Sequence, residues 1–189
     1  ITYGRYKNGS SDFKYLSYTP GKSNNDATDM DVVEKPVFSE KGGFLDNEFQ
    51  LTLTDNNDNE IYDTTDGSDP RTSDTAKLYS EGIRIYNNTS EPNVYSAIRD
   101  ITLTEYTPTS KKVEKGIVIR AASKNADGKF SEVEHNSYFV GKTASYYKDM
   151  KVISMATDSD YLFDIDDGAY MIGKGYYEWL RSPEFEQLD

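Results

Sequence analysis

Short stretches of alternating hydrophobic and polar residues run through the middle of the chain. Phe49, Leu51 and Leu53 alternate with glutamine and threonine. Strict alternation places one set of side chains on each face of an extended strand, so this pattern predicts a strand with one buried face. Residues 60–64 and 83–86 predict two further short strands.

A long hairpin is predicted between residues 116 and 140. Three residues of its first strand share one face: Ile117, Ile119 and Ala121. The polar residues 125–128 supply the turn, and Val133, Tyr138 and Val140 are expected on the returning strand. Because the strands follow one another without helices between them, the sequence predicts an all-β fold, an immunoglobulin-like β-sandwich.

The two ends of the chain differ from this middle part in composition and in hydrophobic pattern. Residues 1–33 are polar and rich in turns, and we expect a ribbon that docks on the rest or belongs to a preceding domain. Residues 142–189 predict a mixed α/β segment that is too short to close a core of its own. Its expected elements are strands at 151–156 and 169–172 and helical turns at 158–164 and 176–180.

These differences divide the chain into a sandwich at residues 34–141 between two short, non-autonomous flanking segments, 1–33 and 142–189. Two interpretations of residues 87–115 remain, a long connection between the sheets or an inserted hairpin. The sequence begins with Ile1 and not with methionine, so we expect a piece of a longer protein.

Composition narrows the classes of function. The chain has 33 acidic against 21 Lys and Arg residues, a formal net charge of −12, so it repels phosphate backbones and nucleic-acid binding is not expected. It has no cysteine, which excludes disulfides and thiolate metal sites. No apolar run is long enough to span a membrane. The 16 tyrosines compensate for few aliphatic residues, because a buried aromatic ring removes a large area from water.

One run of residues carries a specific family resemblance. It is Ile61-Tyr-Asp-Thr-Thr-Asp-Gly-Ser-Asp-Pro70, supported by Pro36-Val-Phe-Ser39 and Phe49-Gln-Leu-Thr-Leu53. Together these residues make 36–140 resemble the chitobiase/β-hexosaminidase C-terminal-like module, which is an immunoglobulin-like sandwich. The family's usual form is IYYTLDGSDP, and Asp63 stands here where an aromatic residue is common.

Both flanking segments carry resemblances of their own. Residues 152–174 look like the first strands of the CotH family, the spore-coat-protein-H-like atypical kinases. Residues 3–6 together with 18–24 are similar to the last strand and exit of a lamin-tail-like domain. The three resemblances follow one another in the order that secreted bacterial CotH proteins show.

These resemblances imply an extracellular or cell-surface bacterial protein, in which this piece is a non-catalytic spacer or interaction module beside neighbouring domains of the same chain. In the CotH family the nucleotide- and metal-binding residues lie downstream of the entry strands, so no enzymatic activity and no cofactor are expected here. Two alternatives remain open. The chain is a carbohydrate-binding module for cell-wall or plant polysaccharide, or it is a truncated atypical protein kinase, inactive as given.

Two groups of residues are candidate binding sites. Tyr62, Tyr79 and Tyr86, with Tyr95 nearby in sequence, would form a flat aromatic platform for sugar rings, although tyrosines on sandwich strands more often pack in the core. Asp66 and Asp69, with Asp63 and Asp74, would surround a Ca²⁺ ion. Turn chemistry explains the same Asp-Gly-Ser-Asp-Pro run without a metal. His135 is the only histidine and is expected to face solvent.

Overall fold

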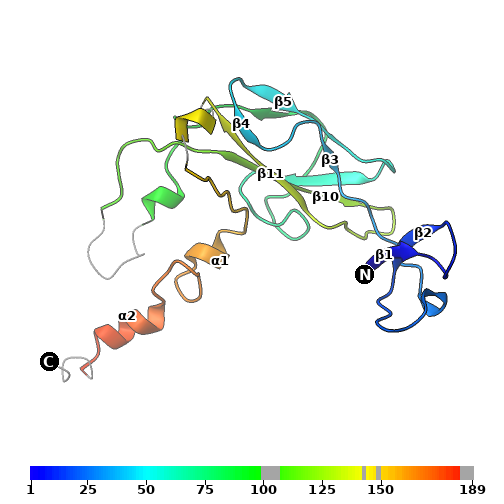
Figure 1. Ribbon diagram of the computed structural model, residues 1–189. Coiled ribbons are helices and arrows are strands. Elements are labelled where there is room, and N and C mark those ends of the chain that lie inside the picture. The colour runs from blue at the N-terminus through cyan, green and yellow to red at the C-terminus, as the bar shows by residue number, and fades with distance from the viewer. Residues whose placement is uncertain (99–106, 142–143, 148–149, 184–189) are drawn as a thin grey trace.

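The computed structural model describes residues 1–98, 107–141, 144–147 and 150–183, and they form a mostly β structure (Figure 1). The strands are β1 (Thr2–Arg5), β2 (Phe13–Leu16), β3 (Val37–Phe38), β4 (Gly43–Leu45), β5 (Phe49–Leu51), β6 (Leu53–Thr54), β7 (Glu60–Thr64), β8 (Lys77–Leu78), β9 (Ile83–Ile85), β10 (Ile117–Lys124) and β11 (Glu134–Val140). Two short α-helices, α1 (Asp160–Phe163) and α2 (Lys174–Leu180), lie near the C-terminus. Three 3-10 turns cover Asn24–Asp26, Tyr95–Ala97 and Ala144–Tyr147.

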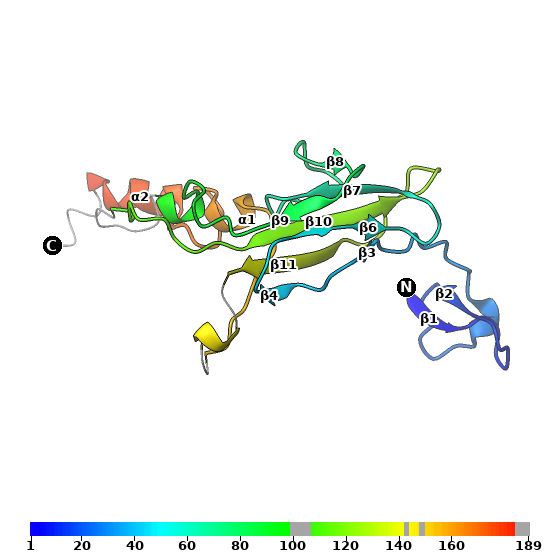
Figure 2. The same cartoon turned by 90° about the horizontal axis from the view of Figure 1, so that it is seen from above.

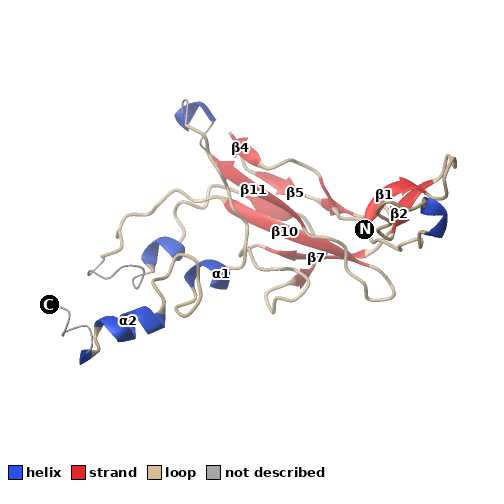
Figure 3. Cartoon of the chain, turned by 60° about the horizontal axis from the view of Figure 1, so that its bottom comes forward, coloured by secondary structure: helices blue, strands red, loops and turns tan. Residues whose placement is uncertain are grey.

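The centre of the molecule is the predicted β-sandwich. One layer is a five-stranded sheet in the order β4-β11-β10-β7-β8, in which only β4 and β11 run parallel. The other layer consists of two strand pairs, β3–β6 and β5–β9. Figure 3 shows β4, β5, β7, β10 and β11 together in the middle of the molecule, with α1 and α2 outside them. The all-β sandwich predicted from the sequence is therefore confirmed.

The core between the two layers comes from the predicted alternating positions. Leu51, Leu53 and Ile85 of one layer meet Ile119 and Tyr138 of the other. All five side chains are buried, and the edge of the Phe49 ring meets Tyr138, with 5.6 Å between the ring centroids. The Tyr138 hydroxyl donates a hydrogen bond to the carbonyl oxygen of Glu40 over 2.8 Å, so the polar end of this ring is paired.

The long hairpin forms as the sequence predicts. β10 pairs antiparallel with β11, from Ile117 opposite Tyr138 to Ala121 opposite Glu134. The turn closes with hydrogen bonds between Asn125 and Lys129, and Gly128 takes the left-handed backbone conformation with φ of 80°. β10 also pairs with β7, so it lies at the centre of the five-stranded sheet.

The N-terminal segment is a separate two-stranded hairpin, β1–β2, which lies beyond one end of the sandwich (Figure 1). Tyr3 stands opposite Tyr15 in its register. The free edge of β2 is covered by residues 28–30, where the Ser17 amide donates to Thr28 and the Met30 amide donates to Tyr15. Leu16 is buried on the inner face of the hairpin.

The C-terminal segment lies at the opposite end of the sandwich, as the view from above in Figure 2 shows. The two helical turns expected here are present as α1 and α2. The strands expected at 151–156 and 169–172 are not formed. Among the described residues, the backbone of residues 151–156 has no hydrogen-bond partner. β11 is already paired on both edges, with β4 and β10, so this apolar run cannot extend the sheet there. Ile153 is accordingly exposed.

The described part of residues 87–115 contains the 3-10 turn Tyr95–Ala97 and no strand. Residues 99–106 lie outside the described residues, so the choice between a long connection and an inserted hairpin stays open. Among the described residues, no helix has the length and apolar character that crossing a membrane requires.

Candidate functional site

The three tyrosines of the predicted aromatic platform do not share one surface. Tyr79 packs against the core, and its hydroxyl oxygen accepts the amide of Leu53 over 3.1 Å. Tyr62 lies on the other face of β7, where its ring and that of Phe130 meet edge to face with 5.7 Å between centroids. Tyr86 follows β9 and carries the Arg84 guanidinium 4.9 Å from its ring centroid. Carbohydrate binding by these three residues stays a prediction, but a single flat platform cannot be built from them.

The loop between β7 and β8 is held by a cluster of hydroxyl groups around Asp66. Ser68 Oγ donates to Asp66 Oδ1 over 2.6 Å, and Thr75 Oγ1 donates to Oδ2 over 2.7 Å. Ser73 Oγ lies 2.9 Å from Ser68 Oγ and 2.8 Å from Thr75 Oγ1. Burial raises the pKa of Asp66, but the Ser68 and Thr75 hydrogen bonds outweigh it and hold the pKa below its usual range.

Asp69 and Arg71 form a second anchor of the same loop. The Arg71 guanidinium donates from Nε to Oδ1 over 3.0 Å and from Nη2 to Oδ2 over 2.7 Å. This hydrogen-bonded pair lowers the pKa of Asp69. Both carboxylates predicted as calcium ligands therefore accept hydrogen bonds from side chains of their own loop. The described residues contain no group of three or more acidic or histidine side chains arranged to hold a metal ion.

Arg120 ties this loop to the centre of the sheet. Its Nη1 donates to the carbonyl oxygen of Gly67 over 2.8 Å, although the two residues are far apart in sequence. Gly67 has a φ of 88°, and a Cβ atom there would lie 2.8 Å from the carbonyl oxygen of Thr157. Glycine is thus required twice at this position, for its backbone conformation and for the close approach of the C-terminal segment.

Asp63 and His135 are two other titratable residues that the sequence analysis singled out. Asp63, in the place where the resembling family has an aromatic residue, is buried, and burial raises its pKa while Lys77 opposes that shift. His135 lies on β11 with its side chain exposed, as expected.

A group of exposed aromatic rings that the sequence did not single out lies on the N-terminal hairpin. Tyr3, Phe13 and Tyr15 occupy one face of β1–β2, and their exposed fractions are 64%, 46% and 41%. The ring centroids of Tyr3 and Tyr15 are 5.0 Å apart, and those of Tyr3 and Phe13 are 5.9 Å apart. The Arg5 guanidinium lies 5.1 Å from the centroid of Phe13. The sequence showed these residues only as hydrophobic positions in a turn-rich ribbon, because their common face depends on the pairing of β1 with β2.

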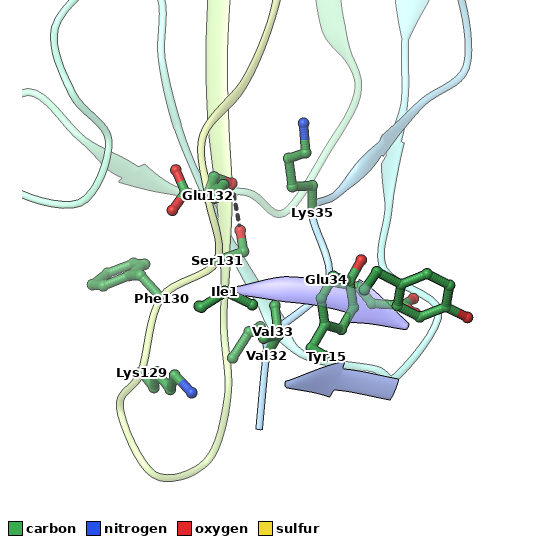
Figure 4. A pocket seen from close by; sticks show the side chains of 11 residues that line it. Ile1, Tyr15, Val32, Val33, Glu34, Lys35, Lys129, Phe130, Ser131 and Glu132 are labelled. Carbon is green, nitrogen blue, oxygen red and sulfur yellow. Dashed lines mark hydrogen bonds between the residues drawn. The ribbon is translucent and has the colours of Figure 1, made fainter. Parts of the chain in front are cut away.

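This face opens into a cleft between the hairpin and the sandwich, of about 570 Å³. Figure 4 shows Tyr15 on one side of the cleft and Phe130, from the turn that joins β10 to β11, on the other. Val32 and Val33 lie between them, and Lys129 and Glu132 stand at the sandwich side. We call this the hairpin cleft.

A second cleft, of about 650 Å³, lies at the other end of β10. It is lined by the residues before and at the start of β10, by the stretch around Tyr95, and by residues of the C-terminal segment. Tyr95 stacks on Phe163 of α1 with 5.4 Å between centroids and 18° between ring planes, and its hydroxyl donates to the carbonyl oxygen of Asp66. Burial raises the pKa of Tyr95, and the charge of Asp66 adds to this shift. This stack is a packed contact between the C-terminal segment and the stretch around Tyr95, beside the cleft.

One comparison with known proteins finds a similar family within the sandwich. The sequence model of the family described as "Fn3 associated" matches residues 49–138, just under half of the chain. The match lies within the sandwich and supports the immunoglobulin-like character that the sequence predicts. It does not extend to the flanking segments, so their CotH and lamin-tail resemblances stay predictions. No curated protein sequence and no solved structure matches this chain.

Proposed function

We propose that residues 34–141 are a non-catalytic spacer that holds two neighbouring segments apart in a larger extracellular or cell-surface bacterial protein of the CotH type. One observation carries this proposal. The N-terminal hairpin meets the sandwich at the turn after β10, whereas the C-terminal segment meets it at the residues before and at the start of β10. The central strand therefore separates the two flanking segments by its own length.

The contacts at the C-terminal end are specific enough to fix an orientation. Thr157 passes directly over Gly67, Phe163 stacks on Tyr95, and Ser154 Oγ donates to Ser137 Oγ over 2.7 Å. A spacer needs fixed attachment points of this kind, because a loosely tethered neighbour would sample many distances. In this proposal the neighbours are the lamin-tail-like and CotH-like domains, and the carboxylates of the β7–β8 loop serve structure and not catalysis.

The absence of cysteine from the chain makes a distance measurement direct. Ser11→Cys in the hairpin and Lys174→Cys in α2 allow a fluorophore pair to be attached, and energy transfer is then recorded on single molecules. We expect one narrow distance distribution, matched by a control pair within the sandwich, Glu81→Cys with Asp127→Cys. A broad distribution for the first pair beside a narrow one for the control would reject the spacer.

A further inference from the structure

The aromatic face of the hairpin is left open although the other face of the same hairpin is covered. Leu16 points inward and is buried, and so are Ala27 and Val33 of the segment that follows. Tyr3 and Tyr15, which stand on the opposite face by the alternation of a strand, stay exposed beside the hairpin cleft. Hydrophobic rings gathered on an exposed surface next to a cleft are typical of a binding site.

The rings continue across the cleft onto the sandwich. Phe130 lies on the far side, and its ring meets Tyr62 edge to face. The Lys124 ammonium lies 5.4 Å from the centroids of both rings. A strip of aromatic side chains therefore runs from Phe13 through Tyr3 and Tyr15 to the opposite wall, with the cleft in its middle.

The chemistry of the strip favours one class of ligand. Aromatic faces carry partial negative charge and attract the weakly positive C–H groups on the flat face of a sugar ring. The cleft adds charged side chains at its edge, Glu34 and Glu132 as acceptors and Lys129 as a donor, which pair with sugar hydroxyl groups. A net charge of −12 disfavours an anionic polymer, so the fitting ligand is neutral.

We infer that the hairpin cleft binds a neutral polysaccharide chain, whose sugar rings stack on Tyr3 and Tyr15 and reach Phe130 across the cleft. This site differs from the platform of Tyr62, Tyr79 and Tyr86 predicted from the sequence, because it joins the N-terminal segment to the sandwich. It needs only the hairpin to be fixed against the sandwich. The spacer fails without this site if the C-terminal segment alone moves, and a spacer without glycan affinity keeps its fixed distance.

Affinity electrophoresis of the full chain tests the inference, with native gels that contain xyloglucan, mixed-linkage β-glucan or glycol chitin, and polygalacturonate as the anionic polymer. We expect retardation in at least one neutral gel and none in polygalacturonate. Tyr15→Ala and Phe130→Ala are expected to weaken that binding about tenfold or more, as the loss of a central aromatic contact does. Tyr15→Phe keeps the ring and is expected to bind.

A matched control is Tyr18→Ala, which removes an exposed tyrosine from the same segment outside the cleft and is expected to leave binding unchanged. Because Phe130 belongs to the sandwich and Tyr15 to the hairpin, misfolding of one variant leaves the other informative. Retardation in no neutral gel, retardation in polygalacturonate only, or neutral binding that survives both alanine variants would overturn the inference. So would a dimer on size-exclusion chromatography that Tyr15→Ala dissociates, because the face would then belong to a second copy.

Discussion

Tyr138→Ala is expected to lower the free energy of unfolding by about 4 kcal/mol, the range observed when a large buried aromatic side chain is truncated. Tyr138 has an exposed fraction of 0% and lies in the core cluster between the two layers. Its removal leaves Phe49 without its edge-to-face partner and the Glu40 carbonyl oxygen without its donor. Because the free energy of unfolding of a domain of this size is only about 5–15 kcal/mol, the variant is expected to lose much of its stability.

Urea unfolding followed by circular dichroism measures this loss. Tyr138→Phe keeps the ring and removes only the hydroxyl hydrogen bond, so a loss of about 1 kcal/mol is expected. Tyr161→Ala makes the same change of residue at a position that is 73% exposed, and its effect is expected within about 0.5 kcal/mol. If the two alanine variants unfolded at the same urea concentration, Tyr138 would not be the centre of the core.

Asp66→Ala is expected to cost about 1.5 kcal/mol at neutral pH, because Ser68 and Thr75 lose the acceptor of their hydroxyl hydrogen bonds. Since the folded state holds the pKa of Asp66 below the ordinary value of 3.8, the carboxylate stabilises the fold above that value. This contribution is lost as the pH falls through the lower pKa of the folded state. The stability difference between wild type and Asp66→Ala is therefore expected to shrink in acid.

The pH series separates the carboxylate from the shape of the loop. Asp66→Asn retains one acceptor oxygen and is expected to lose less stability than Asp66→Ala at neutral pH. Thermal unfolding of all three proteins between about pH 7 and pH 3 gives the comparison. A difference between wild type and Asp66→Ala that stays constant over this range would show that the charge of Asp66 has no part in holding the loop.

Local patterns in the sequence were sufficient for the central layers of the fold. The alternation of Phe49, Leu51 and Leu53 identified one core face, and the structure buries Leu51 and Leu53 and packs Phe49 against them. Residues 117–140 contained both strands and the turn of the long hairpin. These features depend on residues that are close in sequence, and periodicity and turn residues are therefore sufficient to predict them.

Features that depend on contacts between residues far apart in sequence could not be predicted from local patterns. Alternation places Tyr62 on one face of β7, but the loop that follows interrupts the period, so nothing in the sequence shows that Tyr79 faces the core. The aromatic face of Tyr3 and Tyr15 depends on the register of β1 with β2. Conversely, residues 151–156 have the composition of a strand but pair with no strand in the described part of the chain.

The sandwich accounts for the two clefts described above, because each forms where a flanking segment meets one end of β10. In our proposals one small module has two separate roles, a fixed spacing through the contact with α1 and a ligand-binding surface at the hairpin. The low aliphatic content noted in the sequence fits a single thin core with partly exposed neighbours.

The most direct measurement is urea unfolding of residues 34–141 produced alone, followed by circular dichroism. The account predicts one cooperative transition, because the whole core cluster of the described residues lies within 34–141 and none of its members comes from the described flanking segments. Its midpoint is expected to match the transition of the sandwich in the 189-residue chain. A non-cooperative, sloping curve would contradict the account, because a module that cannot fold without its neighbours cannot be the body that holds them apart.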